Sequence, residues 1–280
     1  MSNLLTLAPK AQKHSAISYD FETISQKLYE IFDKEKDSQN SILIKVDNGA
    51  IAKIAMFLSG TIKRSASIGV AGETASGKST VTLDIINAIK NFSKKHQLEN
   101  TIARINTDDY YYDRSDMVQK AGSFANFAKN YDFDVPEALE LSLMKKHIFE
   151  LLDGKNVMLP KYDMSGTAIR YDNKTFTRPS KIIISEGLFT LTEKVKDAFD
   201  FKIYVDIDKK IQEERFYARA IERGLGNSAK NILENANKKA QIHVVPCKET
   251  ADIVLSGQVD RIKYINFMNK ILNLVEEIYY

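Results

Sequence analysis

The chain has 280 residues, of which 44% are hydrophobic and 28% are charged, and its net charge is +3 at pH 7. This composition is typical of a globular protein, and the net charge is too small to indicate nucleic-acid binding by the molecule as a whole. A lone cysteine, Cys247, excludes an internal disulfide and a cysteine-built metal site and suits a reducing compartment. No apolar run approaches the ~18 residues of a membrane span, and residues 1–15 lack the apolar core of a secretory signal. We therefore expect a cytoplasmic protein.

The segment 1–62 is predicted to be a helical extension that packs on a larger domain, which covers 63–280. Residues 1–19 show no periodicity and are expected to form a loosely held arm. Apolar residues then recur at helical spacing from Phe21 to Phe32, with Asp20 as a candidate N-cap. A short strand-like run at 42–46 and a second helical pattern ending near Leu58 complete the segment. Its apolar stripe is more typical of a core than of a partner site.

A glycine-rich segment follows a short apolar strand predicted at 67–71 and precedes a helix predicted from residue 78. It reads Gly72-Glu73-Thr74-Ala75-Ser76-Gly77-Lys78-Ser79-Thr80, which has the spacing of a phosphate-binding P-loop. In such a loop the lysine reaches the β- and γ-phosphates of a nucleotide, and the serine hydroxyl binds Mg²⁺. We expect residues 72–80 to bind ATP; the alternative is a glycine-rich turn without a ligand. Glu73 must point outward or pair with a cation, because a free carboxylate would weaken phosphate binding.

Strand and helix patterns alternate along the rest of the chain. Strands are predicted at 101–106, 182–187, 201–205 and 251–255, and helices at 135–152, 209–223, 228–240 and 259–275. Such alternation is typical of a parallel α/β sheet with helices on its faces. The charged segment at about 208–248 is predicted to be a helical lid.

Two acids stand at the ends of predicted strands. In a parallel sheet, ligands bind at the carboxyl ends of the strands. Asp108 comes after the strand at 101–106, and Glu186 ends the strand at 182–187. Together with Ser79 they are candidate Mg²⁺ ligands, directly or through water, because Mg²⁺ favours few carboxylates and keeps water ligands. Asp108 is also our candidate for the general base that deprotonates an attacking hydroxyl, in preference to Asp109. The alternative for either of these two acids is turn or helix capping.

Three arginines, Arg215, Arg219 and Arg223, are spaced by four residues and so share one face of a helix. A kinase must keep water from its γ-phosphate, and a mobile helix that carries arginines does so while it neutralises charge. We expect Arg215 and Arg219, with Lys78, to act on the transferred phosphoryl group and Arg223 to contact ATP. The alternative is a solvated, ion-paired helix face.

Between Ile68 and about Gly257 the chain resembles the uridine kinase and phosphoribulokinase family of P-loop kinases. The segment 106–111 is similar to the family's catalytic segment, in which the first acid is the general base. The segment 133–138 resembles the Phe-Asp-His-Pro-Asp-Ala motif of nucleoside kinases, which implies that Asp134 binds ribose hydroxyls. The segment 160–163 resembles the family's substrate loop. The resemblance implies that the acceptor is bound by Tyr111, Phe133, Asp134, Tyr162, Arg170 and Arg215.

The chain departs from this family pattern in two places. Uridine and cytidine kinases carry a base-recognising histidine in the loop after Tyr-Asp, but the loop at 164–169 has none. Pyrimidine specificity is therefore not inherited directly, and another nucleoside, a sugar phosphate or a pantothenate-like alcohol stays open as the acceptor. The resemblance also leaves the segment before about residue 60 uncovered.

The sequence thus predicts an α/β, P-loop kinase-like three-layer fold with a parallel sheet, a helical lid and an N-terminal helical extension. The predicted function is transfer of the γ-phosphate of ATP, with Mg²⁺, to a primary hydroxyl, most readily that of a nucleoside such as uridine or cytidine. We expect no nucleic-acid or membrane partner, and a homo-oligomer is left open. The alternative is a nucleotide-binding regulatory protein that transfers no phosphate. Glu73 and the missing histidine favour it, whereas the intact set Lys78, Ser79, Asp108 and Glu186 disfavours it.

Overall fold

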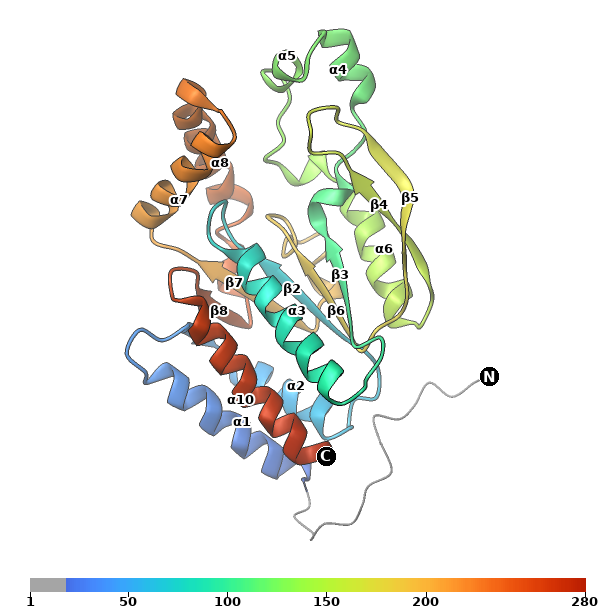
Figure 1. Ribbon diagram of the computed structural model, residues 1–280, viewed down its shortest axis with the longest axis vertical. Helices are drawn as coiled ribbons and strands as arrows, with labels where there is room; N and C mark the ends of the chain where they lie inside the picture. Colours follow the sequence, from blue (N-terminus) through green and yellow to red (C-terminus); the bar gives the residue numbers. More distant parts are fainter. Residues whose placement is uncertain (1–18) are drawn as a thin grey trace.

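A six-stranded sheet lies at the centre of the molecule (Figure 1), in a computed structural model that describes residues 19–280. The strands lie in the order β1 (Leu43–Val46), β8 (Ile253–Ser256), β7 (Phe201–Asp206), β2 (Ala66–Ala71), β6 (Ile182–Glu186) and β3 (Ile102–Asn106). All neighbours pair in parallel except β1, which runs antiparallel to β8. Because the chain crosses to opposite sides of β2, the loops at the carboxyl end of β2 lie where such folds bind ligands.

Helices cover both faces of the sheet, which makes the three predicted layers. On one face, α3 (Lys78–Lys95), α10 (Arg261–Tyr279), α1 (Phe21–Lys36) and α2 (Asn48–Leu58) share a core with apolar side chains of β2, β6 and β8. On the other face, α6 (Leu141–Leu152), α8 (Ala229–His243) and α9 (Cys247–Thr250) contribute to a second core that includes Ile105, Ile183 and Val254 of the sheet. Covering on both faces explains why the central strands read as continuous apolar runs. The α/β fold class is thereby confirmed.

The elements around the carboxyl ends of the strands form two groups that face each other (Figure 1). One group is α7 (Lys209–Glu222) with α8, joined by a short 3₁₀ turn, η4 (Gly226–Ser228). The other is α4 (Ser115–Ala121), α5 (Phe124–Ala128) and a two-stranded hairpin of β4 (Val157–Tyr162) and β5 (Arg170–Thr177). The P-loop lies at the base of both groups (Figure 1). Three further 3₁₀ turns are η1 (Thr107–Tyr110), η2 (Pro136–Ala138) and η3 (Lys196–Ala198).

The N-terminal segment is built into the main sheet. Asp20 caps α1, since its side chain accepts a hydrogen bond from the Thr23 N–H at 2.9 Å. Ile24 and Leu28 are fully buried in the same core as β2 and α3. The described part of 1–62 therefore shares its core with the rest of the chain, and the division into domains at residue 62 stays a prediction. The arm expected at 1–19 lies outside the described residues, except for Tyr19.

The helix predicted at 135–152 is wrong in its first turn. The chain forms η2 and then an extended residue, Leu139, before α6 begins at Leu141. Tertiary pairing overrides the helical pattern, because Tyr111 and Leu139 form an antiparallel bridge and the Glu140 N–H donates to the Tyr110 carbonyl at 2.8 Å. The hairpin and the helices α4 and α5 were not predicted.

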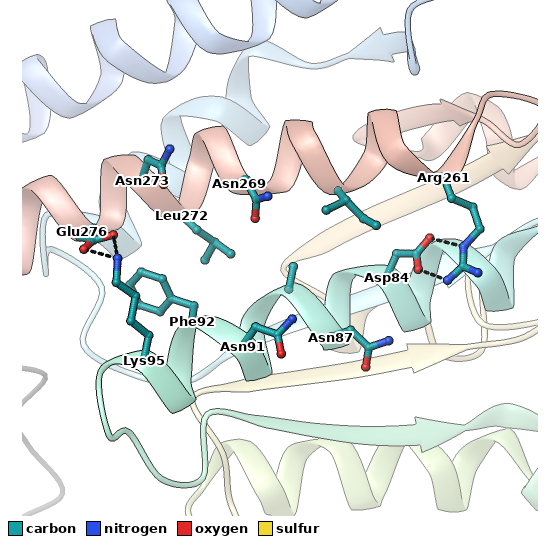
Figure 2. A pocket seen from close by; sticks show the side chains of 12 residues that line it. Asp84, Asn87, Asn91, Phe92, Lys95, Arg261, Asn269, Leu272, Asn273 and Glu276 are labelled. Atoms are coloured by element: carbon teal, nitrogen blue, oxygen red, sulfur yellow. Dashed lines mark hydrogen bonds and ion pairs between the residues drawn. The ribbon is translucent and has the colours of Figure 1, made fainter.

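Two ion pairs tie α3 to α10, although these helices lie far apart in the sequence (Figure 2). Arg261 Nη2 lies 2.5 Å from Asp84 Oδ1 at one end, and Lys95 Nζ lies 2.6 Å from Glu276 Oε1 at the other. Between them runs an open groove of about 370 Å³ that is lined largely by asparagines and apolar side chains. No P-loop residue lines it, so this groove is not part of the candidate active site described below.

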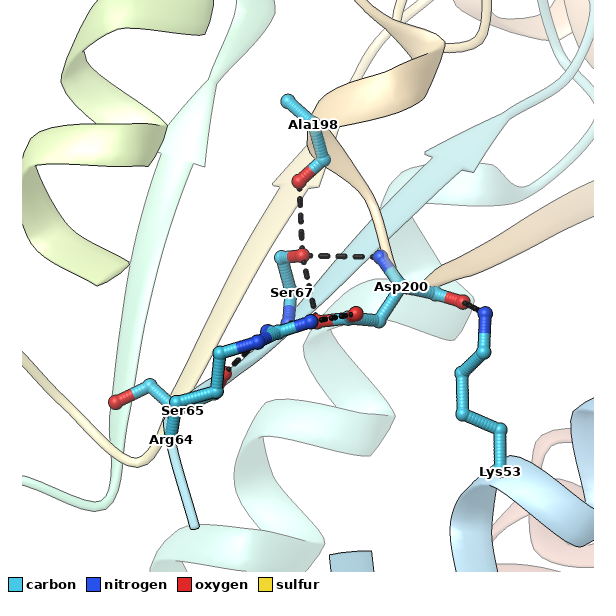
Figure 3. A network of polar contacts seen from close by, with 6 residues as sticks. All are labelled: Lys53, Arg64, Ser65, Ser67, Ala198 and Asp200. Atoms are coloured by element: carbon cyan, nitrogen blue, oxygen red, sulfur yellow. Dashed lines mark hydrogen bonds and ion pairs between the residues drawn. The ribbon is translucent and has the colours of Figure 1, made fainter. Parts of the chain in front are cut away.

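A buried acid fixes the opposite end of the sheet, where β2 and β7 begin (Figure 3). Asp200 accepts hydrogen bonds from Arg64 Nη1 at 2.7 Å and from the Ser67 N–H at 3.0 Å. Burial raises the pKa of Asp200, but the hydrogen bonds from Arg64 and Ser67 outweigh it and hold the pKa below its ordinary value. Among the helices described, none is long and apolar enough to cross a membrane.

Candidate active site

The P-loop is held in an unusual backbone conformation. Gly77 has φ +93° and Ala75 has φ +61°, both in the left-handed region. Only glycine reaches that region without strain, and strained backbone of this kind concentrates at functional sites. Gly77 is also the N-cap of α3, and no side chain caps that end of the helix. The first N–H groups of α3 therefore remain available to an anion.

Two side chains of the loop fit a phosphate chain. Ser76 Oγ is buried and finds no hydrogen-bond partner among the described residues, which is the state expected of a group that awaits a ligand. Lys78 Nζ lies 3.5 Å from the Glu73 carbonyl oxygen, so it folds back over the loop. Burial lowers the pKa of Lys78, while Asp108 and Glu186 oppose the shift. A bound phosphate would give the Lys78 ammonium an anionic partner and so offset the cost of its burial.

Ser79 and Glu186 meet at the carboxyl end of β6. Ser79 Oγ donates to Glu186 Oε2 at 2.9 Å, and Arg104 Nη2 lies 2.6 Å from Glu186 Oε1. One hydroxyl and one carboxylate at this spacing fit Mg²⁺, which takes oxygen ligands and retains several waters. Within the described residues there is no group of three or more acidic, histidine or cysteine side chains placed to hold a metal by themselves. The donor set therefore suits a metal that arrives with a phosphate.

Asp108 and Asp109 lie side by side in η1 but have different surroundings. Asp109 Oδ1 lies 3.0 Å from Lys161 Nζ and accepts the Tyr162 N–H at 3.3 Å, so it fastens η1 to β4. Asp108 instead lies near Lys78 and Glu186. Burial raises the pKa of Asp108, Lys78 opposes the shift, and Glu186 and Asp109 add to it. A raised pKa brings a carboxylate closer to the range of an effective general base.

Two arginines of α7, Arg215 and Arg219, lie near the P-loop, whereas Arg223 is the exposed C-cap of that helix. In the part of the chain that the structure describes, Arg215, Arg219 and Arg223 form no ion pair. Arg215 Nη1 donates to the Gly257 carbonyl at 2.7 Å. Burial lowers the pKa of Arg219, and the neighbouring Arg223 and Arg215 lower it further. Arg219 also acts on the pKa of Lys78, so these cations lie close together. Clustered like charges of this kind favour binding of a polyanion.

Aromatic rings line the side of η1 that faces the hairpin. The Tyr111 ring lies 5.3 Å from the Tyr162 ring and 5.9 Å from the Phe133 ring, measured between centroids. The Tyr111 hydroxyl donates to the Phe133 carbonyl at 3.1 Å, whereas the buried Tyr162 hydroxyl has no partner among the described residues. The three predicted acceptor-binding aromatics are thus brought together next to Asp108.

The two charged residues predicted to bind the acceptor differ in their placement. Asp134 lines a narrow cleft with Thr74 and with side chains of α8, and burial raises its pKa, with a further contribution from Asp132. Arg170 lies apart from this cleft. Its guanidinium is 2.9 Å from Glu140 Oε2 and its Nε is 2.9 Å from Asp172 Oδ1. The structure therefore does not present Arg170 as a free cation to the acceptor.

Four residues at this site were not singled out from the sequence. Lys209 Nζ lies 2.6 Å from Glu73 Oε1, which confirms that Glu73 pairs with a cation. Gln212 donates to the Thr74 carbonyl at 3.0 Å, Arg104 holds Glu186, and Gly257 packs on the loop. Glu73 itself was the signal that a cation was needed. Nothing in the local sequence identifies Lys209 as that cation.

In this fold a central parallel strand leads through a P-loop into a helix. Acids stand at the ends of neighbouring strands, and arginines lie on a helix next to the loop. Together these features define a P-loop kinase. The fold is similar to that of D-glycerate 3-kinase from Cryptococcus neoformans, with a TM-score of 0.50 and 12% identity, over 88% of this chain and 98% of that one.

Residues 67–262 match the model of the phosphoribulokinase / uridine kinase family, and the chain belongs to this family. It is 33% identical over 217 residues to a uridine kinase of Streptococcus thermophilus, which covers 75% of this chain and 95% of the relative. It is 31% identical over 198 residues to a uridine kinase of Clostridium perfringens, over 69% of this chain and 88% of the relative. The chain is thus a kinase, an ATP-dependent phosphotransferase with an alcohol as acceptor.

Proposed function

We propose that this kinase transfers the γ-phosphate of ATP to a primary hydroxyl of a nucleoside such as uridine or cytidine. The observation that carries the proposal is the position of Asp108. Asp108 lies close enough to Lys78 of the P-loop and to Tyr111 of the ring cluster to influence the pKa of both. The names of the relatives support the choice of a nucleoside.

The proposed chemistry follows from this geometry. The N–H groups at the start of α3 bind the phosphates, with Lys78 on the β- and γ-phosphates. Ser79 and Glu186 would hold Mg²⁺, which neutralises charge on the phosphates when it is bound. Asp108 accepts the proton of the acceptor hydroxyl as the hydroxyl oxygen attacks the γ-phosphorus, and the bond from the γ-phosphorus to the β,γ-bridging oxygen breaks so that ADP leaves. Lys78 and Arg219 stabilise the charge that spreads over the transferred group.

The acceptor pocket suits a flat ring joined to a sugar. Tyr111, Tyr162 and Phe133 present aromatic surface, which favours a planar base through stacking. Asp134 is the proposed ligand of the ribose hydroxyls. The loop at 164–169 is closed on itself, because Asp163 Oδ2 accepts hydrogen bonds from Ser165 and Thr167. With no histidine in that loop, a sugar phosphate or a pantothenate-like alcohol is the alternative acceptor.

The test is ADP release, measured across nucleosides, sugar phosphates and pantothenate. We expect stimulation by uridine or cytidine, and the substitution Asp108→Asn should lower kcat by about 10²–10⁴-fold while ATP affinity changes little. Asp109→Asn, the matched change in the adjacent acid, should act mainly on the KM of the acceptor. Stimulation by none of these alcohols would refute the acceptor class, and loss of ATP binding in Asp108→Asn would make Asp108 structural.

A regulatory protein that binds ATP without transferring phosphate was the alternative from the sequence. Glu73 was one of its two supports, and its ion pair with Lys209 removes the objection to phosphate binding. The same assay separates the two functions, since ATP binding without acceptor-stimulated ADP release would favour the regulatory one.

A further inference from the structure

Glu73 is a buried acid inside a loop that is proposed to hold three phosphates. The residue is 4% exposed, and its side chain points away from water toward the base of α7. A carboxylate so placed repels a polyanion, and the repulsion is strong because little water screens it. Some feature of this chain must offset that charge if the loop is to bind ATP.

Lys209, the first residue of α7, meets this carboxylate directly. Its Nζ lies 2.6 Å from Glu73 Oε1 and also donates to Gln212 Oε1 at 3.2 Å. Gln212 is fully buried and in turn donates to the Thr74 carbonyl at 3.0 Å. The base of α7 is therefore fastened to two consecutive residues of the P-loop, one by charge and one through its backbone.

The same attachment sets the register of the arginines. Arg215 lies three residues after Gln212 on the same helix, and its Nη1 reaches the Gly257 carbonyl at 2.7 Å. Arg219 follows one turn later and lies close enough to Lys78 to lower its pKa. A shift at the base of α7 would move both guanidinium groups relative to the loop.

We propose that Lys209 is a positioning residue that neutralises Glu73, so that this P-loop tolerates a carboxylate beside bound phosphates and keeps α7 in place over them. The inference rests on the proposed binding of ATP. It assigns Lys209 no contact with the nucleotide, because its ammonium is already engaged by Glu73 and Gln212.

The decisive experiment is a double-mutant cycle read by calorimetric binding of ADP and of a nonhydrolysable ATP analogue. Lys209→Met leaves Glu73 charged and unpaired, and it should weaken nucleotide affinity about tenfold or more. Glu73→Gln keeps the shape of the side chain without its charge, so it should bind both nucleotides about tenfold more tightly than Lys209→Met does. The double variant should return to within about threefold of the wild type. Rescue of one loss by a second substitution is the signature of charge neutralisation.

Lys210→Met is the matched control. Lys210 is the next residue of α7, is exposed, and makes no side-chain ion pair in the described structure, so its loss removes the same charge from the same turn. It should leave affinity within about twofold. Thermal unfolding without nucleotide gives a second readout, in which Lys209→Met lowers Tm and the double variant recovers it.

Two results would overturn the inference. Equal loss of affinity in Lys209→Met, Glu73→Gln and the double variant would show that the pair acts only as a mechanical fastening. Wild-type affinity in Lys209→Met would show that Glu73 does not disturb phosphate binding. Failure of the wild type itself to bind either nucleotide would instead refute the proposed function, so the two failures are distinguishable.

Discussion

Replacement of Gly257 by alanine tests the contact between the turn after β8 and the P-loop. A Cβ at this position would lie 1.9 Å from the carbonyl oxygen of Ser76, about 1.1 Å inside the 3.0 Å limit that real Cβ atoms respect. The same atom would lie 3.0 Å from the carbonyl of Asp206 in β7. Both neighbours are backbone, so no flexible side chain can move aside. Either the P-loop at Ser76 or the turn that carries Gly257 must therefore shift.

Forcing one methyl group into such a contact destabilises a protein by about 1–3 kcal/mol. For a chain of this size each kcal/mol lowers Tm by about 2–4 °C, so Gly257→Ala should unfold about 2–12 °C below the wild type. Displacement of the Ser76 carbonyl also disturbs the N–H groups beside it, and we expect ADP affinity to fall more than about tenfold, which corresponds to about 1.4 kcal/mol.

Differential scanning fluorimetry and calorimetric titration with ADP measure the two effects. Gly49→Ala is the control, because Gly49 lies in α2 and its Cβ would come no closer than 3.2 Å to the Asp47 carboxylate. That variant should bind ADP as the wild type does. If Gly257→Ala matched the wild type in both Tm and ADP affinity, the described packing of the turn on the loop would be incorrect.

Three further substitutions follow from buried charges. Arg104→Met should raise the calorimetric affinity for Mg²⁺ in the presence of saturating ADP about tenfold, because Glu186 Oε1 loses a competing cation; unchanged affinity would contradict this. Asp200→Asn should lower the free energy of unfolding by about 1–3 kcal/mol at pH 7, because the buried Ser67 N–H loses its charged acceptor while the half-exposed Arg64 stays solvated. Since the pKa of Asp200 is depressed on folding, this difference should shrink in acid denaturation curves as pH falls below about 4. Asp108→Asn should raise Tm at pH 7–8 without nucleotide, because the raised pKa means that the ionised form opposes folding, and a lower Tm would refute this.

The parts of the fold that depend on local pattern were predictable from the sequence. The strand before the P-loop, the helix after it and the strands that end at Asn106 and Glu186 follow from short-range periodicity. The start of α6 did not, because a bridge between Tyr111 and Leu139 decides it. The exposed strand β5 carries polar side chains on both faces and so lacks the alternation that identifies a strand.

The site divides in the same way. Lys78, Ser79, Asp108 and Glu186 could be named because each stands at a motif or at the end of a strand. Lys209 could not, since it meets Glu73 across 136 residues of sequence and nothing near either residue specifies the pairing. The spacing of the arginines predicts one shared helix face, and only the structure shows that they lack carboxylate partners in the region described.

Strand β1 has a consequence for the outer border of the sheet. It pairs with β8 through Lys45 and Val46, on the side where β8 would otherwise present unsatisfied main-chain donors and acceptors. An edge strand with unpaired N–H and C=O groups can pair with a strand of another molecule. In a chain trimmed to residues 67–262, the apolar β8 would be the edge strand; in the full chain the edge strand is β1, which has four residues and carries Lys45, and short edge strands with lysine discourage pairing with other molecules.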